Sequence, residues 1–140
     1  YGNNTLSGSV AGLTSLTLLS VYGNNTLSGS VAGLTGLTAL YVYGNNTVTD
    51  LELLAASNGK LSQMSHGGLT VLSSEQVNAI LAGFWANRDV AKPRATERSI
   101  SIASNGSGAP TGQGLTDKAA LAGYKSPNNT GPMYWTVTTP

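Results

Sequence analysis

Side chains that could perform catalysis or hold a metal ion are few in this sequence. His66 is the single histidine and there is no cysteine, so a zinc site would lack the converging ligands that it needs. The setting Ser-His-Gly-Gly predicts that His66 is a polar loop residue. Asp50 and Glu52 would share one face of a strand, a spacing that paired carboxylates could use for acid–base chemistry. Two acids beside the first charged turn are more typical of a solvated edge, so we expect no enzyme, no metal site and no cofactor.

The one basic cluster of the chain is interrupted by acids. It consists of Arg88, Lys92, Arg94 and Arg98, with Asp89 and Glu97 among them. Mixed charges of this kind favour a solvated loop over an anion site. The glycine-rich stretch GSGAPTGQG lacks the Gly-Lys-Ser/Thr ending of a phosphate loop. The formal net charge is only +1 and no apolar run reaches about 18 residues, so we expect no nucleic-acid partner and no membrane insertion.

The elements that must position these residues are dominated by an internal repeat. Residues 1–21 and 22–42 differ only at the paired positions 15/36, 18/39 and 20/41, and a third unit opens at Tyr43. Every charged residue lies at Asp50 or later. Such short units cannot bury their apolar faces alone, so they must stack on one another and end in a cap. Because the sequence opens inside a unit, we expect it to be a piece of a longer protein.

Read across the unit boundary, the apolar positions follow the pattern LxxLxxLxVxxNxxL. The first copy is formed by Leu13, Leu16, Leu19, Val21, Asn24 and Leu27, and the second by Leu34, Leu37, Leu40, Val42, Asn45 and Val48. This pattern resembles the leucine-rich-repeat family. The resemblance implies an α/β solenoid of short, 21-residue coils, with a parallel sheet on its concave face and an extended or 3₁₀ convex side. It also implies an interior ladder of asparagines formed by Asn3, Asn24 and Asn45.

The remainder of the chain is predicted to be a strand–helix cap. We expect repeats over residues 1–54 and irregular or longer repeats with the cap over residues 55–140, in one continuous domain. Strands are predicted over residues 51–54, 60–65, 99–103 and 134–139, and helices over residues 73–87 and 116–123, with loops at 92–94, 105–114 and 126–132. Ser73 and Gln76 form a capping-box pattern at the start of the first helix. The tail is similar to the C-terminal ends of leucine-rich-repeat proteins of bacterial surfaces and phage tail fibres.

Outward positions of the predicted concave sheet are the candidate binding residues. They are Leu18, Ser20, Tyr22, Ala39, Tyr41 and Tyr43. Tyr1, Tyr22 and Tyr43 would form a ladder, and tyrosine among serine and glycine suits general recognition and stacking on sugars. Two of the three differences between the units fall on this face. We therefore expect a non-enzymatic recognition or adhesion module for a cell-surface glycan or protein, located outside the cell, on a cell surface or on a virion. The alternative is a structural spacer or a self-assembling fibre subunit, which would be a homo-oligomer.

Overall fold

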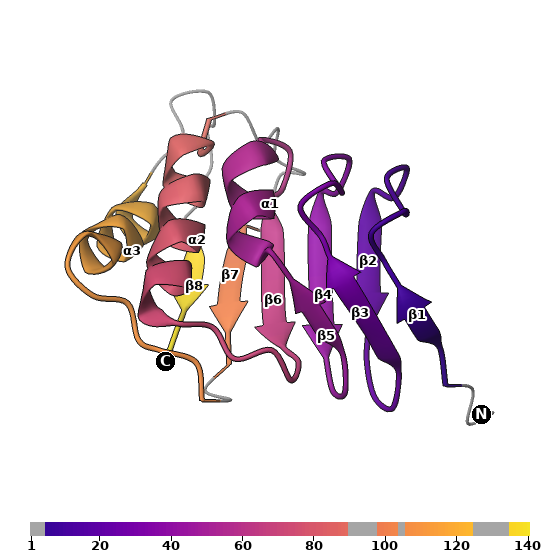
Figure 1. Ribbon diagram of the computed structural model, residues 1–140. Helices are drawn as coiled ribbons and strands as arrows, with labels where there is room; N and C mark the ends of the chain where they lie inside the picture. Colours follow the sequence, from indigo (N-terminus) through magenta and orange to yellow (C-terminus); the bar gives the residue numbers. More distant parts are fainter. Residues whose placement is uncertain (1–4, 90–97, 104–105, 125–134) are drawn as a thin grey trace.

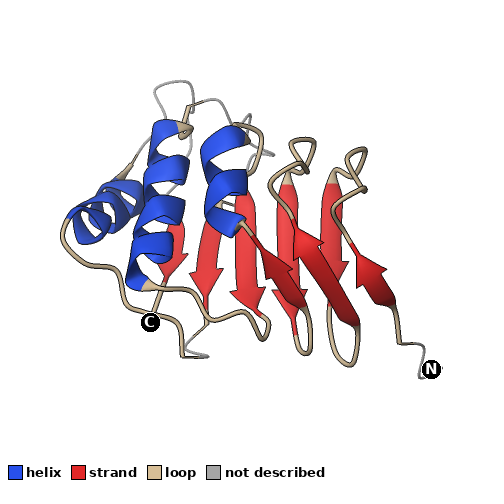
Figure 2. Cartoon of the chain, viewed as in Figure 1, coloured by secondary structure: helices blue, strands red, loops and turns tan. Residues whose placement is uncertain are grey.

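The computed structural model describes residues 5–89, 98–103, 106–124 and 135–140, and these form an α/β fold with two parallel sheets (Figure 1). The larger sheet has the order β2 (Leu18–Val21), β4 (Ala39–Tyr43), β6 (Gln63–Gly67), β7 (Ser99–Ile102) and β8 (Thr136–Thr138). The smaller sheet has the order β1 (Ser7–Ser9), β3 (Thr26–Ser30) and β5 (Thr47–Thr49). The helices are α1 (Leu51–Ser57), α2 (Ser74–Ala86) and α3 (Gln113–Gly123). The smaller sheet and the helices lie on the same face of the larger sheet (Figure 2).

Strand pairing in the larger sheet follows the sequence repeat where the repeat exists. Leu18 pairs with Ala39, which is the equivalent residue of the next unit. Later strands are separated by longer segments, because Gln63 pairs with Ser99 and Ser99 with Thr136. The longer connections hold α2 and α3, as parallel pairing requires a crossover. This arrangement is compatible with the expected α/β solenoid.

The return side of the first coils is extended, as the sequence predicts, and becomes helical only after β5. The prediction of a strand over residues 51–54 is wrong, because this segment starts α1. Leu51, Leu54 and Ala55 are buried, and their spacing of three and four residues places them on one face of a helix.

One apolar core lies between the larger sheet and the elements that cover it. It runs without interruption from Val10 in the first coil to Trp135 beside the last strand, and so it crosses residue 54. Inward strand residues form two rows across the sheet, which alternate with outward residues as expected for strands. These rows are Leu19, Leu40, Met64 and Ile100, and then Val21, Val42, His66 and Ile102.

The predicted capping box is present at the start of α2. The Ser73 hydroxyl accepts a hydrogen bond from the Gln76 backbone N–H at 3.2 Å, and the Gln76 side chain accepts one from the Ser73 N–H at 3.0 Å. Two glycines then allow the helices to pack closely. A Cβ on Gly83 would lie 2.7 Å from the backbone of Ala55, and one on Gly114 would lie 2.0 Å from the Asn78 side chain. In the described part of the chain, no helix is both long and apolar enough to cross a bilayer.

The other predicted boundaries differ by a few residues from those observed. The strand expected over residues 60–65 is β6, which begins at Gln63, and the strand expected over 134–139 is observed as β8. Helix α3 begins at Gln113 rather than at Thr116. The predicted loops at 92–94 and 126–132 lie outside the described residues, as does Tyr134.

Candidate ligand-binding face

Side chains of the larger sheet that point away from the helices form a surface that we call the open face. The strand register arranges them in three rows. The first row is Leu18, Ala39, Gln63, Ser99 and Thr136, the second is Ser20, Tyr41, Ser65, Ser101 and Thr138, and the third is Tyr22, Tyr43 and Gly67. None of these residues is charged. The open face therefore offers hydroxyls, one amide and aromatic rings, but no acid, base or cation.

Tyr22 and Tyr43 form the predicted ladder. Their ring centroids are 5.1 Å apart and their planes differ by 9°, a stacked geometry that contributes about 0.5–1.5 kcal/mol beyond burial. The Tyr43 ring lies over Gly67, because a Cβ there would be 2.7 Å from Tyr43 Cδ1. The Tyr43 hydroxyl also hydrogen-bonds the Ser65 hydroxyl. Tyr43 is thus a fixed support, and Tyr22, which is 54% exposed, rests on it.

The remaining candidate residues differ in how much surface they present. Leu18 and Ser20 are exposed, and Tyr41 is half-buried with its hydroxyl donating to Gln63 Oε1. Ala39 is only 8% exposed, so it adds little surface for contact with a ligand. Tyr1, the first rung of the expected ladder, lies outside the described residues.

The interior asparagines lie one residue later than predicted. Asn24 and Asn45 are exposed, whereas Asn25 is half-buried and Asn46 is fully buried. Asn46 Oδ1 accepts from the Leu27 N–H at 2.9 Å and its Nδ2 donates to the Tyr43 carbonyl at 2.6 Å. Asn25 makes the equivalent bonds to Leu6 and Tyr22. Asn3 lies outside the described residues.

The interior asparagine is displaced by one residue because side chains of the extended chain after the turn point alternately inward and outward. Gly44 adopts a φ of 75°, and a Cβ there would lie 2.1 Å from the Gly23 carbonyl oxygen, so the turn requires glycine. Asn46 then lies two residues before the inward Val48, with the exposed Thr47 between them. Residues two apart share a strand face, which places Asn46, and not Asn45, in the interior.

His66 is a buried strand residue, and the prediction of a polar loop residue is wrong. It lies in β6, points into the core and has no exposed surface. Nε2 is 2.8 Å from the Thr70 carbonyl oxygen, which fixes the proton on that nitrogen in the neutral ring. Nδ1 is buried and has no hydrogen-bond partner among the described residues. Burial lowers the pKa of His66, and the Thr70 carbonyl opposes this in part.

The two acids proposed to share a strand face do not do so. Asp50 has a left-handed backbone conformation, with a φ of 63°, immediately before α1, and Glu52 lies in the first turn of that helix. Glu52 Oε1 accepts a hydrogen bond from Gln76 Nε2 at 3.2 Å. This contact joins α1 to α2.

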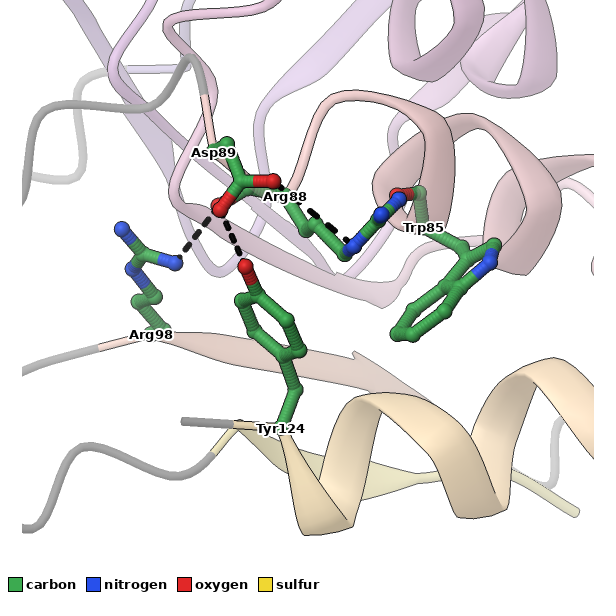
Figure 3. A network of polar contacts seen from close by, with 5 residues as sticks. All are labelled: Trp85, Arg88, Asp89, Arg98 and Tyr124. Atoms are coloured by element: carbon green, nitrogen blue, oxygen red, sulfur yellow. Dashed lines mark hydrogen bonds and ion pairs between the residues drawn. The ribbon is translucent and has the colours of Figure 1, made fainter. Parts of the chain in front are cut away.

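Two members of the basic cluster, Arg88 and Arg98, lie among the described residues, and there they belong to a packed network of polar contacts (Figure 3). The Arg88 guanidinium lies over the Trp85 ring, 4.1 Å from its centroid, and donates to the Trp85 carbonyl. Tyr124 donates to Asp89, which raises the pKa of Tyr124. Arg98 is 5% exposed, points toward Asp89 and donates to the Arg88 carbonyl at 2.8 Å. The network ties α2 to α3 and β7, and Lys92 and Arg94 lie outside the described residues.

Within the described residues, no three His, Asp or Glu side chains are grouped so that they could hold a metal ion. What the open face provides is a preformed, uncharged surface with one supported aromatic ring. Comparison of the chain with protein-family models, curated proteins and solved structures gives no match.

Proposed function

We propose that this chain is a non-enzymatic recognition or adhesion module that binds a glycan or a protein through the open face. The observation that supports this most strongly is the exposed Tyr22 ring held against Tyr43. Tyrosine gives a large amphipathic contact area at a low cost in side-chain entropy, and the stack with Tyr43 reduces that cost further.

For the architecture, we propose a leucine-rich-repeat solenoid whose concave side is the open face. The sequence repeats every 21 residues, and residues that pair between β2 and β4, such as Leu18 and Ala39, are also 21 residues apart, which supports this assignment. The resemblance of the tail to bacterial surface proteins and phage tail fibres leads us to propose a location outside the cell, on a cell surface or on a virion.

The proposed function is tested with a printed array of glycans and extracellular proteins, probed with the wild-type chain and two variants. Tyr22→Ala removes the supported ring. Thr47→Ala is the matched control, since Thr47 is an exposed residue of the smaller sheet. We expect Tyr22→Ala to lose signals that Thr47→Ala keeps. Both variants should remain folded, and Tyr22→Ala should lose about 0.5–1.5 kcal/mol of stability with its stack. If both variants lose the same signals, or if neither variant loses any signal, binding through the open face is refuted.

A second candidate function, a structural spacer or a self-assembling fibre subunit, is favoured by the uncharged first part of the chain. Residues 1–49 carry no charge that would oppose packing between copies. Light scattering after size-exclusion chromatography separates the two candidates. An elongated oligomer supports the fibre, and a monomer at high concentration excludes it.

A further inference from the structure

We propose that His66 is an acid-sensitive latch, which holds residues 68–71 closed when it is neutral and releases them when it gains a proton. We call residues 68–71 the strap. The strap follows β6, the strand that carries His66, and leads toward α2 (Figure 1). Three features carry the inference: the place of the strap on the imidazole ring, a buried nitrogen without a partner, and the bonds that hold the strap. This device does not depend on the proposed function.

The strap covers the edge of the imidazole ring that carries both nitrogens. The Thr70 carbonyl oxygen lies 2.8 Å from Nε2, and a Cβ on Gly68 would lie 3.4 Å from Cε1, the atom bonded to both nitrogens. Val42 and Ile102 flank His66 in the inward row of the sheet. The His66 side chain has no exposed surface. Displacement of the strap would therefore bring water to this edge of the ring.

Protonation of His66 creates a charge that the closed strap does not accommodate. In the neutral ring Nε2 carries the proton and donates to Thr70, and Nδ1 has no hydrogen-bond partner among the described residues. A second proton turns Nδ1 into a donor, and a buried cation whose donor lacks an acceptor is strongly unfavourable. In the open state water accepts that hydrogen bond. Acid therefore favours the open strap over the closed one.

The carboxylates near this part of the core do not offset the effect. On the strands and helices around His66, and on the residue that caps α1, the other ionisable side chains are Tyr41, Tyr43, Asp50, Glu52 and Glu75. Both tyrosines lie on the open face, Glu75 is exposed, and Glu52 accepts from Gln76. Burial lowers the pKa of His66, and the Thr70 carbonyl opposes this in part, without a contribution from a carboxylate.

The bonds of the strap allow an opening that is confined to it. The Leu69 N–H donates to the Asn46 carbonyl at 2.9 Å, and Thr70 Oγ1 donates to a carbonyl of β5 at 2.6 Å. Just beyond the strap, the Leu72 N–H donates to Ser107 Oγ at 3.1 Å, and the Leu72 side chain is buried. We expect the bonds of Leu69 and Thr70 to open in acid, while Leu72 keeps the chain anchored to the next coil.

Hydrogen exchange of the Leu69 amide, followed by NMR at low urea concentrations, tests the latch. An opening confined to the strap exposes little surface, so the exchange of Leu69 should not respond to urea. Val31 is the reference, because it is buried and its N–H donates to the Thr49 carbonyl at 3.1 Å, and its exchange should require urea-sensitive unfolding. If the open state has a histidine pKa of about 6.5, protection of the Leu69 amide should fall about threefold to tenfold between about pH 7.5 and about pH 5.5.

His66→Gln is the matched variant, because its side-chain amide keeps a donor for the Thr70 carbonyl and does not titrate. Protection of Leu69 in this variant should not change between the two pH values. The latch is overturned if the variant shows the same fall as the wild-type chain, if the wild-type chain shows no fall, or if Leu69 responds to urea as Val31 does.

Nitrogen NMR of the His66 ring in the wild-type chain gives a second measurement, which does not require the variant to fold. It should show the proton on Nε2 at neutral pH, and the ring should take up its second proton at a lower pH than a histidine exposed to water. A proton on Nδ1 at neutral pH, or a ring that titrates like an exposed histidine, would also overturn the latch.

Discussion

Replacement of Asn46 by alanine should cost far more stability than replacement of its neighbour Asn45. Asn46 satisfies two backbone groups, the Leu27 N–H and the Tyr43 carbonyl, and has no exposed surface. Each buried group left without a partner costs about 1–3 kcal/mol, so the loss of both should lower the free energy of unfolding by about 2–6 kcal/mol. Asn45 is exposed, and its replacement should change the free energy by no more than about 0.5 kcal/mol.

Urea denaturation of the two variants measures this difference. With an m value of roughly 2 kcal/mol/M, Asn46→Ala should lower the midpoint by roughly 1–3 M, and m should not change. Asn25→Ala adds a graded control, because Asn25 makes the same two bonds in a half-buried position. Water can replace part of its role there, so its cost should lie between the other two. Equal costs for Asn45→Ala and Asn46→Ala would refute the assignment of the interior asparagine.

Three further predictions concern the open face, the buried histidine and the helical cap. Gly67→Ala should displace the Tyr43 ring, lower stability by about 1–2 kcal/mol and weaken ligand binding. Gly123→Ala is the control, because no atom lies within 4 Å of the added Cβ, and it should not lower stability. The pKa of His66 is lowered in the folded chain, so the unfolded state takes up the proton first as the pH falls below about 6.5. The stability of the wild-type chain should therefore fall through that pH range more steeply than the stability of His66→Gln. Parallel curves of melting temperature against pH from 7.5 to 5 would contradict this. Ser73→Ala removes the N-cap of α2 and should cost about 1 kcal/mol, which thermal unfolding detects; an unchanged melting temperature would show that the capping box contributes nothing.

The sequence repeat predicted the strand positions well, because near-identical units must use the same residues for the same contacts. The pairing of Leu18 with Ala39 follows directly from the spacing of the repeat. Local signals also predicted the start of α2 and the strand at Ser99. In both segments, the hydrophobic spacing and the neighbouring polar residues agree on one type of element.

The errors arose where tertiary contacts decide between local alternatives. Leu51–Leu54 alone fits either a strand or a helix, and the following Ala-Ala-Ser, which completes α1, was needed to decide. Gly114 predicted a loop, but it lies inside α3, where a glycine allows close approach to Asn78. For His66, the flanking glycines predicted a loop, although the strand extends through Gly67. Nothing in the isolated sequence shows that its neighbour Gly67 has to accommodate the Tyr43 ring.

The structure also changes how the differences between the two repeat units are interpreted. Substitutions at 18/39 and 20/41 suggested that the binding face varies for recognition. Yet Ala39 is nearly buried, and Tyr41 uses its hydroxyl to bond Gln63 of β6, a strand outside the repeat. These two residues fit the second unit to its neighbour and do not require a ligand to explain them. Tyr22 is different, because it is shared with the next unit as Tyr43 and is exposed on the first coil described. The ring position that both repeat units share therefore supports recognition, and the positions that vary do not.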